Sequence, residues 1–101
     1  MERMKLSDGS GRWFDAEKAE KFEEDTWFNG HNHVSVATGD QFTHEVLYKT
    51  AKGLWVLHEW SQWQGSRATY IDIEPARAQD WLLYNGHDDA VPQRVISNLE
   101  V

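Results

Sequence analysis

A tight turn between two runs of strand-forming residues is the feature that most constrains how this chain folds. Ala51-Lys52-Gly53 separates residues 42–50 from residues 54–60, and the second run is especially rich in β-branched and aromatic side chains. A three-residue loop with a glycine in the left-handed conformation joins two adjacent antiparallel strands. The register of this hairpin predicts that Tyr48 lies opposite Val56 and that Gly53 has a positive φ.

The flanking segments predict an antiparallel β-meander of about four strands. Residues 34–37 are expected to form a strand that a two-residue turn at Gly39-Asp40 joins to the strand at 42–50. Residues 68–73 alternate between two faces and form the fourth strand.

The two ends of the chain add helices to this meander. An N-terminal hairpin surrounds the turn at residues 8–11, and Asp15 is expected to cap a helix that runs to about Glu24. At the C-terminal end, residues 75–85 and 88–98 predict a helical pair. The sequence therefore predicts a single α+β domain over residues 1–101: an antiparallel β-meander of about four strands with an N-terminal hairpin and helix and a C-terminal helical pair.

Charge and cysteine content narrow the classes of function. Seventeen acidic and ten basic residues give a net charge of −7, and no stretch carries a basic cluster. A duplex-binding module normally presents a basic face to the phosphates, so direct binding of duplex DNA is not expected. The chain has no cysteine, no apolar stretch of membrane-spanning length and no signal-peptide pattern near Met1. We therefore expect a cytoplasmic protein without disulfides or a membrane segment.

Three histidines offer one candidate site. If both predicted turns hold, His33, His44 and His58 lie on one face of three adjacent strands, where three imidazoles can hold a zinc ion with one open position. The competing interpretation is a neutral, hydrogen-bonded role in the core, because that face also carries Val46 and Val56. No metal or other cofactor is therefore assigned, and the trio is kept as the alternative metal site.

A pair of carboxylates is the second candidate. The hairpin register sets Glu45 opposite Glu59 on the other face of the sheet, an arrangement that general acid and base catalysis can use. A solvated pair of like charges is the simpler interpretation, because no nucleophile motif, phosphate loop or dinucleotide fingerprint accompanies it. The chain is therefore expected not to be an enzyme.

Aromatic and acidic side chains supply the candidate binding residues. Trp is frequent among interface hot spots, and a domain of this size cannot easily bury all six. The favoured patch is the end of the first predicted helix and the residues after it, with a second patch near the end of the third strand. The partner-binding candidates are Glu20, Glu23, Glu24, Asp25, Trp27, Phe28, Trp60 and Trp63.

Two segments also carry a resemblance to a group of small bacterial proteins. Residues 45–57 (EVLYKTAKGLWVL) and residues 73–82 (IEPARAQDWL) resemble uncharacterised proteins encoded on mobile elements. Those proteins combine a similar hairpin with a short helix that contains a Trp-Leu pair. The resemblance covers roughly residues 12–98, and the sequence departs from the pattern at residues 58–63. It implies an anti-defence or host-takeover role, anti-CRISPR proteins among them.

These observations lead to one hypothesis and two alternatives. We expect a non-enzymatic interaction protein that inhibits a host defence protein or another nucleic-acid-binding protein through its acidic and aromatic surface. Its acidic groups would compete for Lys and Arg side chains that otherwise meet phosphate. The alternatives are a metal-binding protein or enzyme built on the three histidines, and a small-ligand module that uses Trp60 and Trp63 as a stacking platform.

Overall fold

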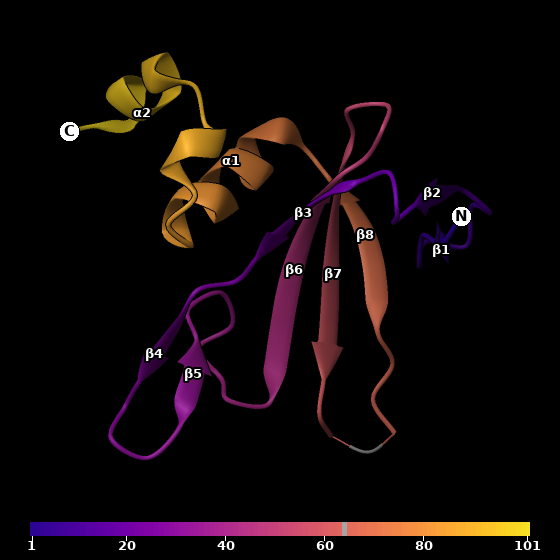
Figure 1. Ribbon diagram of the computed structural model, residues 1–101, viewed down its shortest axis with the longest axis horizontal. Helices are drawn as coiled ribbons and strands as arrows, with labels where there is room; N and C mark the ends of the chain where they lie inside the picture. Colours follow the sequence, from indigo (N-terminus) through magenta and orange to yellow (C-terminus); the bar gives the residue numbers. More distant parts are fainter. Residues whose placement is uncertain (64) are drawn as a thin grey trace.

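A four-stranded antiparallel sheet forms the centre of the protein (Figure 1). The computed structural model describes residues 1–63 and 65–101. The strands are, in order across the sheet, β3 (Glu20–Glu23), β6 (Thr43–Lys49), β7 (Trp55–Ser61) and β8 (Thr69–Ile73). With the helices at the C-terminal end, the sheet confirms the predicted α+β class.

The hairpin of β6 and β7 has the predicted register. Tyr48 lies opposite Val56 and Val46 lies opposite His58. The turn closes through two backbone hydrogen bonds, in which the N–H groups of Thr50 and Gly53 donate to the carbonyls of Leu54 and Thr50. Gly53 has a φ of 84°, which confirms the left-handed conformation.

Replacement of Gly53 tests this turn. We expect Gly53→Val to lower the free energy of unfolding by about 1 kcal/mol or more, because a β-branched residue is strained at positive φ. A Cβ at this position meets no atom within 4 Å, so the backbone conformation rather than a collision causes the loss. Gly53→Asn is the matched control and should lose less, since Asn tolerates this region. Equal urea midpoints for Gly53→Val and the wild type would contradict the assignment.

The predicted helix over residues 15–24 is wrong. Residues 16–19 form turns, and Glu20–Glu23 form β3, which pairs with β6. The predicted helix would have had Ala16, Ala19 and Phe22 as its apolar stripe. Of these only Phe22 is buried, and it lies opposite Leu47. Its three neighbours in β3 are charged and exposed, which suits a short strand at the edge of a sheet. Pairing with β6 therefore outweighs the local helix propensity of this segment.

The N-terminal hairpin is confirmed, and it packs on one face of the sheet. Strand β1 (Arg3–Lys5) pairs with β2 (Trp13–Asp15). Phe14 is buried, and its ring centroid lies 5.2 Å from that of Tyr48 and 5.9 Å from that of Tyr70. This hairpin therefore packs on the sheet face that carries Tyr48 of β6 and Tyr70 of β8.

The predicted turn at Gly39-Asp40 does not join two paired strands. Strand β5 (His33–Ser35) pairs instead with β4 (Thr26–Phe28), and the two form a separate ribbon beside the sheet (Figure 1). Residues 35–43 form a compact turn. Gly39 N–H donates to the Ser35 carbonyl at 2.8 Å, and Thr38 Oγ1 donates to the Thr43 carbonyl at 2.7 Å. These hydrogen bonds redirect the chain between β5 and β6, so β3 takes the place beside β6 that the meander assigned to residues 34–37.

The C-terminal helical pair is present, with a break in its second half. Helix α1 spans Pro75–Tyr84, a 3₁₀ turn η1 spans Asp88–Ala90, and helix α2 spans Gln93–Leu99. The predicted continuous helix over residues 88–98 is wrong because Pro92 disfavours helical geometry at the preceding residue. Val91 is extended, with φ −115° and ψ 131°, and α2 begins only after Pro92.

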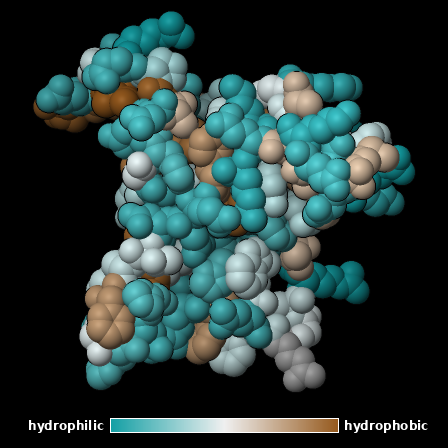
Figure 2. Space-filling view, viewed as in Figure 1, coloured by the Kyte–Doolittle hydropathy of each residue, from teal (hydrophilic) through white to brown (hydrophobic). Residues whose placement is uncertain are grey.

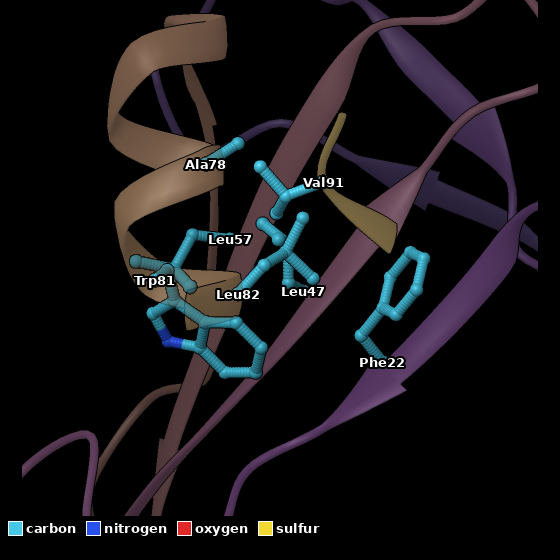
Figure 3. Packing of buried hydrophobic residues seen from close by; sticks show 7 residues of the cluster. All are labelled: Phe22, Leu47, Leu57, Ala78, Trp81, Leu82 and Val91. Carbon is cyan, nitrogen blue, oxygen red and sulfur yellow. The ribbon is translucent and has the colours of Figure 1, made fainter. Parts of the chain in front are cut away.

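The largest apolar cluster lies between α1 and the sheet (Figure 3). Leu47 and Leu57 project from β6 and β7 toward α1 and are almost fully buried. The remaining members are Phe22, Ala78, Trp81, Leu82 and Val91. The expectation that the main core lies on the face of His44 and His58 is therefore wrong, because α1 covers the opposite face. The face with the histidines carries the smaller layer around Phe14.

Side chains and loops cap both edges of the sheet. At the β8 edge, Ser7 N–H donates to the Tyr70 carbonyl and Tyr70 N–H donates to Ser7 Oγ, both at 2.8 Å. At the β3 edge, His87 Nε2–H donates to the Glu23 carbonyl at 2.6 Å. Such caps hinder the addition of a foreign strand, so the side chains of the protein are the better candidates for recognition. Within residues 1–63 and 65–101, no helix has the length and apolar character needed to cross a membrane.

Candidate functional site

The ribbon of β4 and β5 presents two large aromatic side chains. Trp27 is 53% exposed and Phe28 is 60% exposed. The ring of His33 packs beside Phe28, with 5.3 Å between their centroids. The ribbon turns at Asn29, whose Oδ1 accepts hydrogen bonds from two backbone N–H groups within the turn. A short, self-contained turn thus holds both aromatic residues away from the core.

A second aromatic group lies where β6 begins and β7 ends, at the same end of the molecule as the ribbon turn (Figure 1). We call Phe42, His44, Trp60 and Trp63 the sheet-end cluster. Trp63 packs on Phe42 and Trp60 packs on His44, each with 4.6 Å between ring centroids. Trp60 is 36% exposed and Trp63 is 60% exposed. In the view of Figure 2, brown and white side chains appear at this end among the teal ones.

A partly buried hydrogen bond between His44 and Glu24 supports the sheet-end cluster. His44 Nδ1–H donates to Glu24 Oε2 at 2.7 Å, and Glu24 Oε1 accepts the Glu45 backbone N–H at 2.6 Å. The Glu24 side chain is 9% exposed, so this residue is not available to a partner as the sequence prediction requires. Glu24 instead fixes the His44 ring on which Trp60 packs. His44 Nε2 is buried and has no hydrogen-bond partner among the described residues.

The other predicted acidic residues do not form one patch. Glu20 lies at the far end of β3, opposite Lys49, while Glu23 and Asp25 lie near the ribbon. Asp25 N–H donates to Asn85 Oδ1 at 3.0 Å, and His87 contacts Glu23. These contacts bring the 3₁₀ turn η1 close to the start of the ribbon. We call its two exposed acids together with the two on the ribbon side the acidic group: Glu23, Asp25, Asp88 and Asp89.

The predicted histidine trio is wrong because its register rests on the Gly39-Asp40 hairpin. His33 lies in the ribbon, outside the central sheet. His44 and His58 do share a face of β6 and β7. His58 stacks on Tyr70 at 4.2 Å, its Nδ1–H donates to the Thr69 carbonyl, and burial lowers its pKa. Across residues 1–63 and 65–101, no group of three His, Cys, Asp or Glu side chains is placed to hold a metal ion.

The predicted carboxylate pair exists, in a less solvated place than expected. Glu45 lies opposite Glu59, and Trp81 Nε1–H of α1 donates to Glu45 Oε1 at 3.1 Å. Burial raises the pKa of Glu45, and the charge of Glu59 raises it further. The folded protein therefore binds this proton more tightly than the unfolded chain does. Stability is lost as the pH rises from the ordinary value of 4.5 through the folded pKa of Glu45.

Glu45→Gln is expected to stabilise the protein near neutral pH. The amide removes the charge but keeps an oxygen that accepts from Trp81 Nε1–H. We expect a gain of about 0.5 kcal/mol at neutral pH, the scale of like-charge pairs across strands, and no gain near pH 4. Urea unfolding at the two pH values measures the difference. A loss of stability of equal size at both values would show that repulsion and burial do not govern this pair.

Comparisons with known proteins identify no relative of this chain. No protein family, curated protein or solved structure matches this chain. The structural arguments for its function therefore rest on its own residues.

Two parts of the site escape the sequence analysis. The packing of Trp63 on Phe42 joins residues on opposite sides of the hairpin, at the open end of β6 and β7. The hairpin register could have predicted this contact. It sets His44 opposite Trp60, and Phe42 and Trp63 lie just beyond that pair, one next to each strand. The Glu24–His44 pair has no such signal, because it depends on β3 being a strand.

Proposed function

We propose that the protein is a non-enzymatic interaction module that binds a basic partner protein through its aromatic end. The single observation that carries the proposal is the exposure of four large aromatic side chains: Trp27, Phe28, Trp60 and Trp63. They belong to the ribbon and to the segment at the end of β7, and the ribbon turn and the end of β7 lie at the same end of the molecule (Figure 1). Trp is the residue type most enriched among binding hot spots. Two separate elements contribute these side chains, which favours a protein surface over one small ligand stacked between Trp60 and Trp63.

The fixed position of these side chains also supports the proposal. Trp60 rests on His44, which Glu24 holds, and Trp63 rests on Phe42. An aromatic anchor that is already ordered loses little conformational entropy on binding. The sheet-end cluster therefore has the properties of a preformed hot spot.

The charge of the chain supports a basic partner. The acidic group lies at the base of the ribbon that carries Trp27, in a chain of net charge −7. Acidic side chains around an aromatic anchor steer a basic surface into contact and fix its orientation. Surfaces rich in Lys and Arg are those that meet nucleic acid phosphates. The partner is accordingly a nucleic-acid-binding protein, and the chain acts as its inhibitor in the cytoplasm. The resemblance to mobile-element proteins makes a host defence protein the preferred class.

Capture from a nuclease-treated host lysate tests the proposal when it includes matched variants. The wild type and Tyr84→Ser, a control with a 72% exposed aromatic residue on α1, should retain the same partner. The double variant Trp27→Ser with Trp63→Ser should lose it. Addition of the chain should release labelled nucleic acid from the purified partner, while the chain alone should not shift duplex DNA at low salt. A salt-sensitive shift by the chain alone, or unchanged capture by the double variant, would contradict the proposal.

A further inference from the structure

A groove lies at the opposite end of the strands from the aromatic end. It runs between the N-terminal hairpin and the turn that joins β6 to β7, which lie next to each other in Figure 1. Its volume is about 660 Å³, within the range of pockets that bind small molecules. Figure 2 shows light-brown side chains between teal ones over this part of the molecule.

The floor of the groove is apolar. Phe14 and Val56 are buried beneath it, and Leu6 is half-buried beside them. Leu54 and Trp13 also line it, although 57% and 48% of their respective surfaces are exposed. Two large apolar side chains thus extend the buried floor toward solvent, where a ligand with an apolar body would cover them.

The rim of the groove carries three cationic side chains in an otherwise acidic protein. Arg12, Lys18 and Lys52 line it, against the two carboxylates Asp15 and Asp72. Arg12 pairs with Asp8 at 2.8 Å and with Asp72 at 3.2 Å, so its charge is already matched. Asp15 Oδ1 already accepts the backbone N–H groups of Glu2 and Glu17.

Lys18 and Lys52 differ from Arg12 in their contacts with carboxylates. Lys18 affects the pKa of Asp15, yet no carboxylate of the described residues lies within ion-pair distance of Lys18 or Lys52. Two lysines without an ion pair among the described residues, in a chain of net charge −7, favour an anionic ligand at this rim.

We propose that this groove binds a small amphipathic carboxylate, with an apolar chain over Leu54 and Val56 and a carboxylate at the Lys18 and Lys52 rim. The apolar chain of such a molecule covers exposed apolar surface. Its carboxylate meets two lysines that have no ion-pair partner in the part of the chain that the structure describes. The site lies at the Trp55 end of β7, whereas the proposed protein-binding surface lies at the Trp60 end. The two proposals therefore succeed or fail independently.

Dodecanoate, used below its micelle concentration, is the probe for this site. Isothermal titration should show saturable binding to the wild type, with a Kd below about 1 mM. Dodecyltrimethylammonium, with the same chain and the opposite charge, should bind about tenfold more weakly or not at all. Inorganic phosphate should not compete at similar concentrations. No binding of dodecanoate, equal binding of the cationic surfactant or competition by phosphate would each overturn the proposal.

Variants place the binding in the groove. Lys18→Glu with Lys52→Glu, and separately Leu54→Asp, should each weaken dodecanoate binding by about tenfold or more. These side chains are exposed, so thermal melts should stay close to that of the wild type. Lys5→Glu with Arg94→Glu makes the same change in net charge outside the groove and should bind as the wild type does. Wild-type affinity in the groove variants, or equal weakening in the control, would contradict the assignment.

Discussion

Replacement of Leu82 with alanine is expected to lower the free energy of unfolding by about 3 kcal/mol. Leu82 is fully buried where α1 meets the sheet, and truncation of such a side chain leaves a cavity among Leu47, Leu57 and Trp81. For a domain of this size the melting temperature should fall by roughly 12 °C or more.

Leu99→Ala provides the control for this prediction. Leu99 is the last residue of α2 and is 57% exposed, so its loss should change stability by about 0.5 kcal/mol or less. Thermal melts followed by circular dichroism measure both variants. Similar melting temperatures for Leu82→Ala and Leu99→Ala would place the main core elsewhere than between α1 and the sheet.

The second large effect is expected at the aromatic end. Trp63→Ser should speed dissociation of the captured partner by about 30-fold, the effect of removing a hot spot of about 2 kcal/mol. Association should change little, because an aromatic anchor acts after the encounter.

A loss of stability would not explain faster dissociation of the Trp63→Ser variant. Trp63 is 60% exposed, so its replacement should leave the melting temperature close to that of the wild type, as for Tyr84→Ser. Biolayer interferometry with the purified partner measures both rate constants. Unchanged dissociation of Trp63→Ser would remove the sheet-end cluster from the interface.

The part of the fold that the sequence predicts correctly is the part fixed by local signals. The turn at Gly53 sets the pairing of β6 with β7, and from it the Glu45–Glu59 pair and the shared face of His44 and His58 follow. The start of α1 likewise follows from Pro75 at its first position. Each of these features depends on residues within a few positions of one another.

The wrong predictions concern features that depend on contacts between residues far apart in the sequence. Residues 20–23 have the composition of an exposed helix, yet they form a strand because they pair with the edge of β6. The turn at Gly39 contains a signal typical of a hairpin, but hydrogen bonds of Ser35, Thr38 and Asp40 close it into a compact loop. The position of α1 then decides which face of the sheet is the main core, and neither run of strand residues contains that information.

The candidate site shows the same division. The exposure of Trp27, Phe28 and Trp63 agrees with the sequence argument that a small domain cannot bury every aromatic residue. The burial of Glu24 could not be predicted in the same way, because it depends on the contact of Glu24 with His44 of β6, 20 residues later in the chain. The acidic group likewise forms only because η1 lies beside Glu23. The contact that brings them together joins Glu23 to His87, which is 64 residues later in the chain.

Association kinetics across ionic strength test the central claim most directly. Glu23→Lys with Asp89→Lys reverses two charges of the acidic group, and Glu2→Lys with Glu100→Lys makes the same change in net charge at exposed positions elsewhere. With the purified partner, the first pair should slow association by about tenfold at low salt and flatten its dependence on salt, whereas the second pair should retain most of the wild-type rate and slope. Identical association rates and salt slopes for the two double variants would contradict recognition through the acidic group together with the aromatic end.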